Sequence, residues 1–158
     1  MAEGILVLGV GNPLLRDEGV GVLAVQALMA EDWPEGVEFL DAGTLTQDLF
    51  HLQEGYSAFL ILDVARFGGR AGEVRVLDAE DLPGPQGPAA SLHELDLLES
   101  LRLARELGSS PRVRLVLMEP GDCESYGLEL TPEARAGMPG MLAAARAEIA
   151  ALLRADQA

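Results

Sequence analysis

The sequence predicts an α/β fold of three layers, in which a mostly parallel, twisted sheet of about five strands lies between helices on both faces. Apolar runs with the length of buried strands recur along the chain. They occupy residues 4–10, 37–41, 57–63, 73–77 and 112–118. Helical patterns separate or follow these runs. Because parallel neighbours need crossover connections, this alternation favours a mainly parallel sheet, which we assign to the phosphorylase/hydrolase-like type.

Three segments have apolar residues at helical spacing, namely 18–30, 92–107 and 132–154. The last is the clearest helix, because Thr131 is a good N-cap and Pro132 fits the first turn. Three residues inside it are poor helix formers and are expected to kink or break it: Gly137, Pro139 and Gly140.

The chain is long enough to form one domain over residues 1–158 without a disulfide or a structural metal. The segment 83–90, PGPQGPAA, interrupts both periodicities but is too short to link two domains. We expect it to form a loop beside a functional site.

Charge and cysteine content exclude several classes of function. The 26 acidic and 11 basic residues give a net charge of −15, which disfavours binding to DNA or RNA. Cys123 is the only cysteine, so no internal disulfide can form, and its neighbours Asp122 and Glu124 disfavour a reactive thiolate. Residues 4–10 follow the start without a basic region, so we expect no signal peptide, no membrane span and a cytoplasmic protein.

The first loop, Gly9 to Leu14, has the position of a nucleotide-binding turn but not its pattern. Leu14 stands where the third glycine of G-x-G-x-x-G is required. Asp17 and Glu18 would also compete with a pyrophosphate for the start of the next helix. The sequence therefore argues against a dinucleotide cofactor.

Acidic residues follow several of the predicted strands. We interpret Asp17 as a cap of its own helix, and predict that Asp17→Asn keeps activity because asparagine caps nearly as well. Glu18 could be another first-turn acid, and Asp63 and Asp41 could serve turns. However, ligand crevices of open α/β sheets lie at the carboxyl ends of strands, where Glu18 and Asp63 meet. Asp41 is the weaker candidate.

His93 lies in the sequence Ser91-Leu92-His93-Glu94, which has the pattern of a capping box. In the first helical turn the dipole favours the neutral imidazole, which can bind a metal. An ordinary surface histidine is the alternative, and His51 lacks any such context. With Glu18 and Asp63, His93 would form an open site for zinc, nickel, iron or manganese, among which the residue types do not choose.

Four motifs occur together in order: LVLGVGNPLLRDEGVGV at 6–22, FLDAGT at 39–44, LILDVA at 60–65 and SLHELDL at 91–97. Together with GLELTPE at 127–133, they make the chain resemble the hydrogenase maturation proteases, which process the large subunits of nickel-containing hydrogenases. The resemblance covers most of the chain.

This resemblance implies an endopeptidase, of aspartic type or metal-dependent, that removes the C-terminal extension of a hydrogenase large-subunit precursor. Glu18, Asp63 and His93 match the family's metal-binding positions, and an acid at Asp41 belongs to the family pattern and contributes to catalysis. The nickel is supplied by the substrate, so no tightly bound resident metal or other cofactor is expected. The precursor is the expected partner, and the enzyme is expected to be a monomer.

Two other interpretations remain open. A maturation chaperone could recognise the nickel site through the same three residues without proteolysis. Peptidyl-tRNA hydrolase shares the glycine-x-glycine-asparagine-proline motif, but the acidic charge and the absence of its histidine argue against it. For the protease, Glu18→Gln or His93→Ala should abolish cleavage and leave the fold intact.

Overall fold

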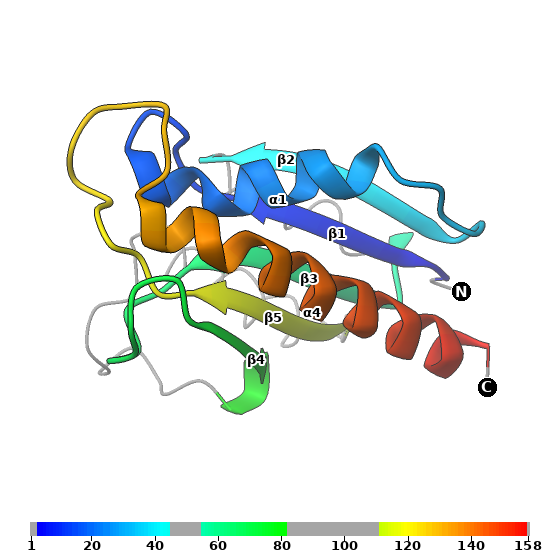
Figure 1. The fold of residues 1–158 in the computed structure, drawn as a ribbon. Coiled ribbons are helices and arrows are strands. Elements are labelled where there is room, and N and C mark those ends of the chain that lie inside the picture. The colour runs from blue at the N-terminus through cyan, green and yellow to red at the C-terminus, as the bar shows by residue number, and fades with distance from the viewer. Residues whose placement is uncertain (1–2, 45–54, 82–110, 158) are drawn as a thin grey trace.

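The computed structural model describes residues 3–44, 55–81 and 111–157, and its described strands form one five-stranded sheet (Figure 1). The strands are β1 (Ile5–Val10), β2 (Val37–Gly43), β3 (Ala58–Val64), β4 (Val74–Asp78) and β5 (Arg112–Met118). The described helices are η1 (Arg16–Gly19), α1 (Val20–Met29), η4 (Ala79–Asp81) and α4 (Pro132–Asp156), of which η1 and η4 are short 3₁₀ helices. All five predicted strands are confirmed to within a few residues.

The sheet has the strand order β2-β1-β3-β5-β4, and only β4 runs antiparallel to its neighbour. The four parallel strands therefore end at one edge, which we call the carboxyl edge. From β1 the chain passes through α1 to β2 on one side, whereas β3 lies on the other side of β1. A crevice for ligands forms at such a reversal of strand order, so the fold places its candidate site between the ends of β1 and β3.

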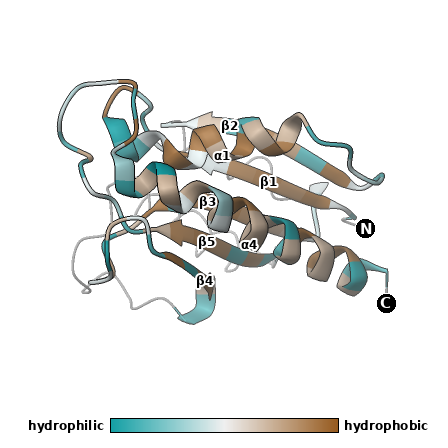
Figure 2. Ribbon diagram, viewed as in Figure 1, coloured by the Kyte–Doolittle hydropathy of each residue, from teal (hydrophilic) through white to brown (hydrophobic). Residues whose placement is uncertain are grey.

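The central strands are buried on both faces. All residues of β1 and β3 are buried (Figure 2 shows their apolar character). The helices α1 and α4 cover one face, where they pack over an apolar cluster that includes Val7, Leu60 and Val116. The opposite face has a second cluster, which includes Leu8, Ile61 and Leu117. The helix predicted for 92–107 lies outside the described residues.

The first helix approaches the sheet closely enough to fix the start of the candidate site. A Cβ atom at Gly21 would lie 2.1 Å from the carbonyl oxygen of Leu62 and 2.5 Å from that of Val10. Only glycine can occupy this position without displacing backbone. Helix α1 therefore starts directly over the ends of β1 and β3.

Helix α4 starts as predicted, because the Thr131 side chain accepts a hydrogen bond from the Ala134 amide at 3.3 Å. The expected break at Gly137, Pro139 and Gly140 is wrong, since one helix runs from Pro132 to Asp156. Gly137 has a packing reason: a Cβ there would lie 2.3 Å from the carbonyl oxygen of Gly72. The proline removes one internal hydrogen bond, and packing on the sheet offsets this loss.

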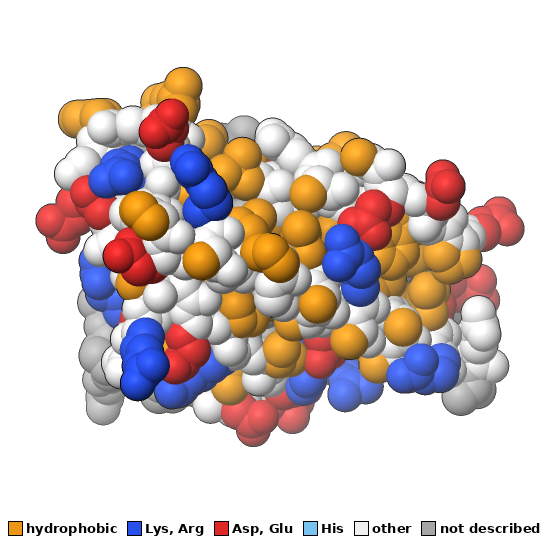
Figure 3. Space-filling model, viewed as in Figure 1, with side chains coloured by type: hydrophobic (Ala, Val, Ile, Leu, Met, Phe, Trp, Pro, Cys, Tyr) orange, Lys and Arg blue, Asp and Glu red, His pale blue; other side chains and the backbone are white. Residues whose placement is uncertain are grey.

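In the described part of the chain, α4 is also the helix whose length and composition would permit a membrane span. Its buried residues line one side and pack on the sheet: Ala134, Met141, Ala145, Ile149 and Leu152. Elsewhere on the helix, Glu148 binds Arg114 through two 3.0 Å hydrogen bonds and Arg146 pairs with Glu31 at 2.9 Å. Figure 3 shows this helix-covered face as a mixture of apolar and charged side chains. These contacts account for the buried apolar residues of α4, and the expectation of no membrane span stays a prediction.

Candidate active site

Glu18 lies on η1, the single turn that joins the loop after β1 to α1. Glu18 is partly buried, and its backbone packs against Gly11, which has a φ of +135°. A Cβ at Gly11 would lie 1.9 Å from the carbonyl oxygen of Glu18. The same position is 3.7 Å from Oδ1 of Asp63. The structure therefore brings the turn that carries Glu18 and the carboxylate of Asp63 against one glycine.

Asp63 is the second-last residue of β3, in the middle of the sheet, and is only 1% exposed. Its Oδ1 accepts a 2.8 Å hydrogen bond from the Val64 amide. Burying a carboxylate is costly, and such groups are concentrated at functional sites. Its position at the reversal between β1 and β3 agrees with the predicted ligand crevice.

Asp41 shares the carboxyl edge but is placed differently. It lies within β2, which continues to Gly43, and its exposed carboxylate accepts a 3.2 Å hydrogen bond from Gln26 of α1. Side chains alternate along a strand, so Asp41 lies on the same face as Phe39, which packs against the cluster under α1 and α4. By the same alternation, Asp63 lies on the face of Ile61, in the opposite cluster.

The remaining predicted site residues lie outside the described part of the chain. These are His93 with its capping box and the loop 83–90. His51, which the sequence does not single out as a site residue, lies outside the described part as well. Among the described residues, no three His, Cys, Asp or Glu side chains are grouped as metal ligands. The role of His93 as the third ligand stays a prediction.

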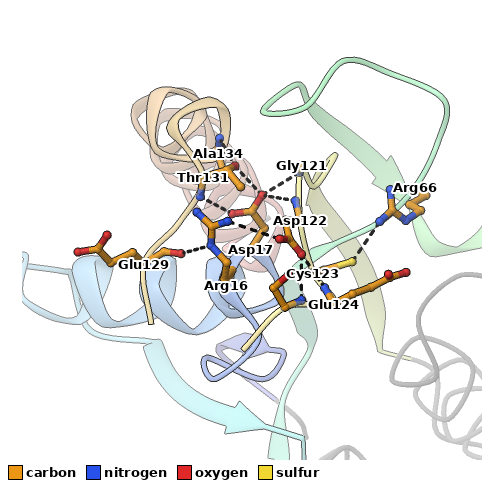
Figure 4. Close-up of polar contacts among 11 residues, drawn as sticks. Arg16, Asp17, Arg66, Gly121, Asp122, Cys123, Glu124, Glu129, Thr131 and Ala134 are labelled. Atoms are coloured by element: carbon orange, nitrogen blue, oxygen red, sulfur yellow. Dashed lines mark hydrogen bonds and ion pairs between the residues drawn. The ribbon is translucent and has the colours of Figure 1, made fainter. Parts of the chain in front are cut away.

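Asp17 does not cap its own helix, and that prediction is wrong. Neither η1 nor α1 has a side-chain cap at its start. The Asp17 carboxylate is instead fully buried and receives four hydrogen bonds from a distant segment (Figure 4). Its Oδ2 accepts from the amides of Gly121 at 2.7 Å and Asp122 at 3.1 Å and from the Thr131 hydroxyl at 2.7 Å. Its Oδ1 accepts from the Thr131 amide at 2.8 Å.

Arg16 reinforces this connection. Its φ of +52° lies in the left-handed region, which costs an ordinary residue about 1 kcal/mol. Its guanidinium donates to the Glu129 carbonyl at 3.1 Å and pairs with Asp122 at 3.4 Å. Amide hydrogen bonds from Ser125 and Glu124 are the main reason that the pKa of Asp122 lies well below its usual range, with Arg16 adding to the effect.

Two further side chains near this edge were missed by sequence reasoning. Glu119 directly follows β5, is 6% exposed, and accepts a 2.7 Å hydrogen bond from the Gly69 amide. The signal that singled out Asp63, an acid at the end of an apolar run, could have found it. Arg66 donates to Sγ of Cys123 at 3.3 Å, a basic contact that the acidic sequence neighbours of this thiol do not reveal.

The sequence and the fold are similar to those of known proteins. The family model described as HycI, hydrogenase maturation protease, matches residues 22–148. The hydrogenase 2 maturation protease of Escherichia coli K12 is 34% identical over 153 residues, covering 95% of this chain and 90% of that protein. The hydrogenase expression/formation protein HupD of Rhizobium leguminosarum is 33% identical, over 89% of this chain and 71% of its own length. The solved structure of the hydrogenase maturating endopeptidase HybD from E. coli has a TM-score of 0.84 at 33% identity, covering 92% of this chain and 91% of its own.

Proposed function

The chain belongs to the hydrogenase maturation protease family, and we propose that it is an endopeptidase that removes the C-terminal extension of a nickel-loaded hydrogenase large-subunit precursor. The observation that carries this proposal is the pair Glu18 and Asp63. Glu18 is on the turn after β1 and Asp63 is the second-last residue of β3, and the Glu18 backbone carbonyl and the Asp63 carboxylate both adjoin Gly11. This is where an open α/β sheet binds its ligands.

The donor set suits a divalent metal that arrives with the substrate. Glu18 and Asp63 supply carboxylate oxygens, and His93 would supply a neutral imidazole, a mixed set compatible with nickel. Asp63 is oriented by its hydrogen bond from Val64, whereas Glu18 is partly exposed and accessible to a protein substrate. We propose that these three residues recognise nickel already bound in the precursor, without a tightly bound resident metal.

The proposed reaction is hydrolysis of one peptide bond. Water adds to the carbonyl carbon, the bond to nitrogen breaks, and the proton lost by water ends on the departing amine. Nickel in the substrate supplies polarisation of that carbonyl or acidification of that water. A carboxylate of the Glu18–Asp63 pair can accept the proton and return it to the amine. We propose a supporting role for Asp41, whose carboxylate contacts Gln26.

We also propose that the protein acts as a monomer in the cytoplasm. Its net charge of −15 and its one cysteine are compatible with this proposal. The precursor is proposed as the partner, because members of this family are maturation proteases. The acidic charge favours a protein over a nucleic acid as substrate.

Incubation of the protein with nickel-loaded and nickel-free precursor tests the proposal. We expect a shortened large subunit only in the loaded sample, and none when Glu18→Gln replaces the wild-type protein. Binding of the loaded precursor without shortening would contradict the protease and support a nickel-recognising chaperone. Equal shortening of both samples would contradict recognition through nickel.

A further inference from the structure

The neighbour of Glu18 has a geometry that the proposed reaction does not use. Asp17 is a fully buried carboxylate whose four hydrogen bonds come from Gly121, Asp122 and Thr131, more than 100 residues away. Burying a charged carboxylate is unfavourable unless its oxygens are satisfied in this way. We call the contacts between Asp17 and these three residues the Asp17 tether.

The tether acts on the turn that carries Glu18. The Asp17 amide also donates to the Asp122 carbonyl at 2.9 Å, so its main chain and side chain are both bound to the same segment. On the other side, the carbonyl of Glu18 is packed against Gly11. The turn is therefore held between the loop after β1 and the segment that leads into α4 (Figure 4).

A local hydrogen bond from the Glu18 amide to the Leu15 carbonyl, at 3.2 Å, is one support of this turn. The helix η1 has four residues, and neither its own start nor the start of α1 has a side-chain cap. Arg16, in the left-handed region, adds strain to the same turn. Long-range contacts add to this support, and four hydrogen bonds among them converge on the Asp17 carboxylate.

We propose that Asp17 is a positioning residue, which fixes Glu18 in the orientation that recognises the nickel of the substrate. This inference rests on the proposed function. Only a carboxylate accepts at all the required points, because an amide group would place an N–H donor against donors already there. Asparagine should therefore fail at this position, although it is nearly isosteric.

The affinity for nickel-loaded precursor, divided by that for nickel-free precursor, tests the proposal. It is measured at a temperature at which circular dichroism shows every variant to be folded. We expect Asp17→Asn to lower this ratio about tenfold or more, because a small displacement of a positioned group has a large effect. Its affinity for nickel-free precursor should stay unchanged.

A double-mutant cycle shows whether Asp17 acts through Glu18. In a Glu18→Gln background, Asp17→Asn should cause no further loss in the ratio, since the group that it positions is already altered. Losses that multiply would overturn the proposal. Equal weakening of binding to both precursors by Asp17→Asn alone would also overturn it, as this would show a structural effect only.

Matched variants separate the tether from general destabilisation. Glu31→Gln removes another carboxylate that binds α4, through Arg146 at 2.9 Å, and should leave the ratio of the two affinities unchanged.

If Asp17→Asn does not fold, the variant Thr131→Val tests the inference in its place, because it removes one donor to Asp17. It should lower the ratio, whereas Thr131→Ser should restore it. An unchanged ratio in Thr131→Val would overturn the inference. A wild-type protein that binds both precursors equally would overturn the proposed function itself, and this inference with it.

Discussion

Acidic side chains attach the two ends of α4 to segments that flank β1 and β3, and these side chains lie in opposite environments. At its start, the buried Asp17 carboxylate accepts hydrogen bonds from Thr131 and the preceding loop. At its other end, the exposed Asp156 accepts from the Gly4 amide at 3.1 Å and the Ser57 hydroxyl at 2.5 Å. Water can replace a partner lost by Asp156, whereas it has little access to Asp17. The polar contacts at the two ends should therefore contribute very differently to stability.

The two ends of α4 also differ in their distance from the proposed site. The end of α4 near Asp17 adjoins the turn with Glu18, whereas the far end lies at the opposite edge of the sheet (Figure 1). Disturbing the near end should change both stability and substrate recognition. Disturbing the far end should change neither by much.

The largest effect should come from the site at the near end. Glu18→Gln or His93→Ala should reduce cleavage of nickel-loaded precursor by at least about a hundredfold, because each removes a group that we propose to contact the substrate's nickel. The free energy of unfolding of Glu18→Gln should change by less than about 0.5 kcal/mol, since its side chain contributes little to the core. Single-turnover cleavage and urea unfolding measure the two effects. Cleavage at the wild-type rate would contradict the site.

Asp17→Asn should lower the free energy of unfolding by about 2 to 3 kcal/mol, because it leaves a buried donor without its acceptor. This replaces the expectation, drawn from helix capping, that asparagine would be tolerated. Urea unfolding monitored through Trp33 checks it. A change below about 0.5 kcal/mol would mean that the tether is not what distinguishes the two ends.

Asp156→Asn is the matched change at the far end. It should alter the free energy of unfolding by less than about 1 kcal/mol and leave cleavage unchanged, because its contacts are exposed to water. The same urea experiment and precursor assay apply. A loss as large as that for Asp17→Asn would remove the contrast between buried and exposed attachment.

The smallest effect concerns Tyr56, just before β3, whose hydroxyl donates to Glu38. This hydrogen bond is the main cause that raises the pKa of Tyr56 from 10 to about 12, with burial adding to it. A raised pKa in the folded state stabilises the fold below pH 10, and that contribution is lost between pH 10 and 12. The stability difference between wild type and Tyr56→Phe should therefore shrink over this range in urea unfolding. A constant difference would contradict the assignment.

The sequence predicts most of the fold because its signals are local. Apolar runs located every strand in the described part of the chain, and strands that alternate with helices placed Glu18 and Asp63 at one edge. The same reasoning extends to Glu119, which also follows a strand. Local patterns could not reveal the partners of Asp17, because 114 residues separate it from Thr131.

The continuity of α4 was missed for a similar reason. Helix propensity correctly marks Gly137 as unfavourable in a helix. It cannot reveal that Gly137 packs against Gly72, 65 residues earlier in the chain, where only a residue without a side chain fits. Arg66 and Cys123 meet in the same way, across 57 residues. Signals of this kind depend on the tertiary fold and appear only once it is known.

The intact mass of the large-subunit precursor tests the central claim most directly. After incubation of the nickel-loaded precursor with wild-type protein, we predict the loss of one C-terminal peptide, and no loss with Glu18→Gln. An unchanged mass with the wild-type protein, or the same loss with Glu18→Gln, would contradict the account.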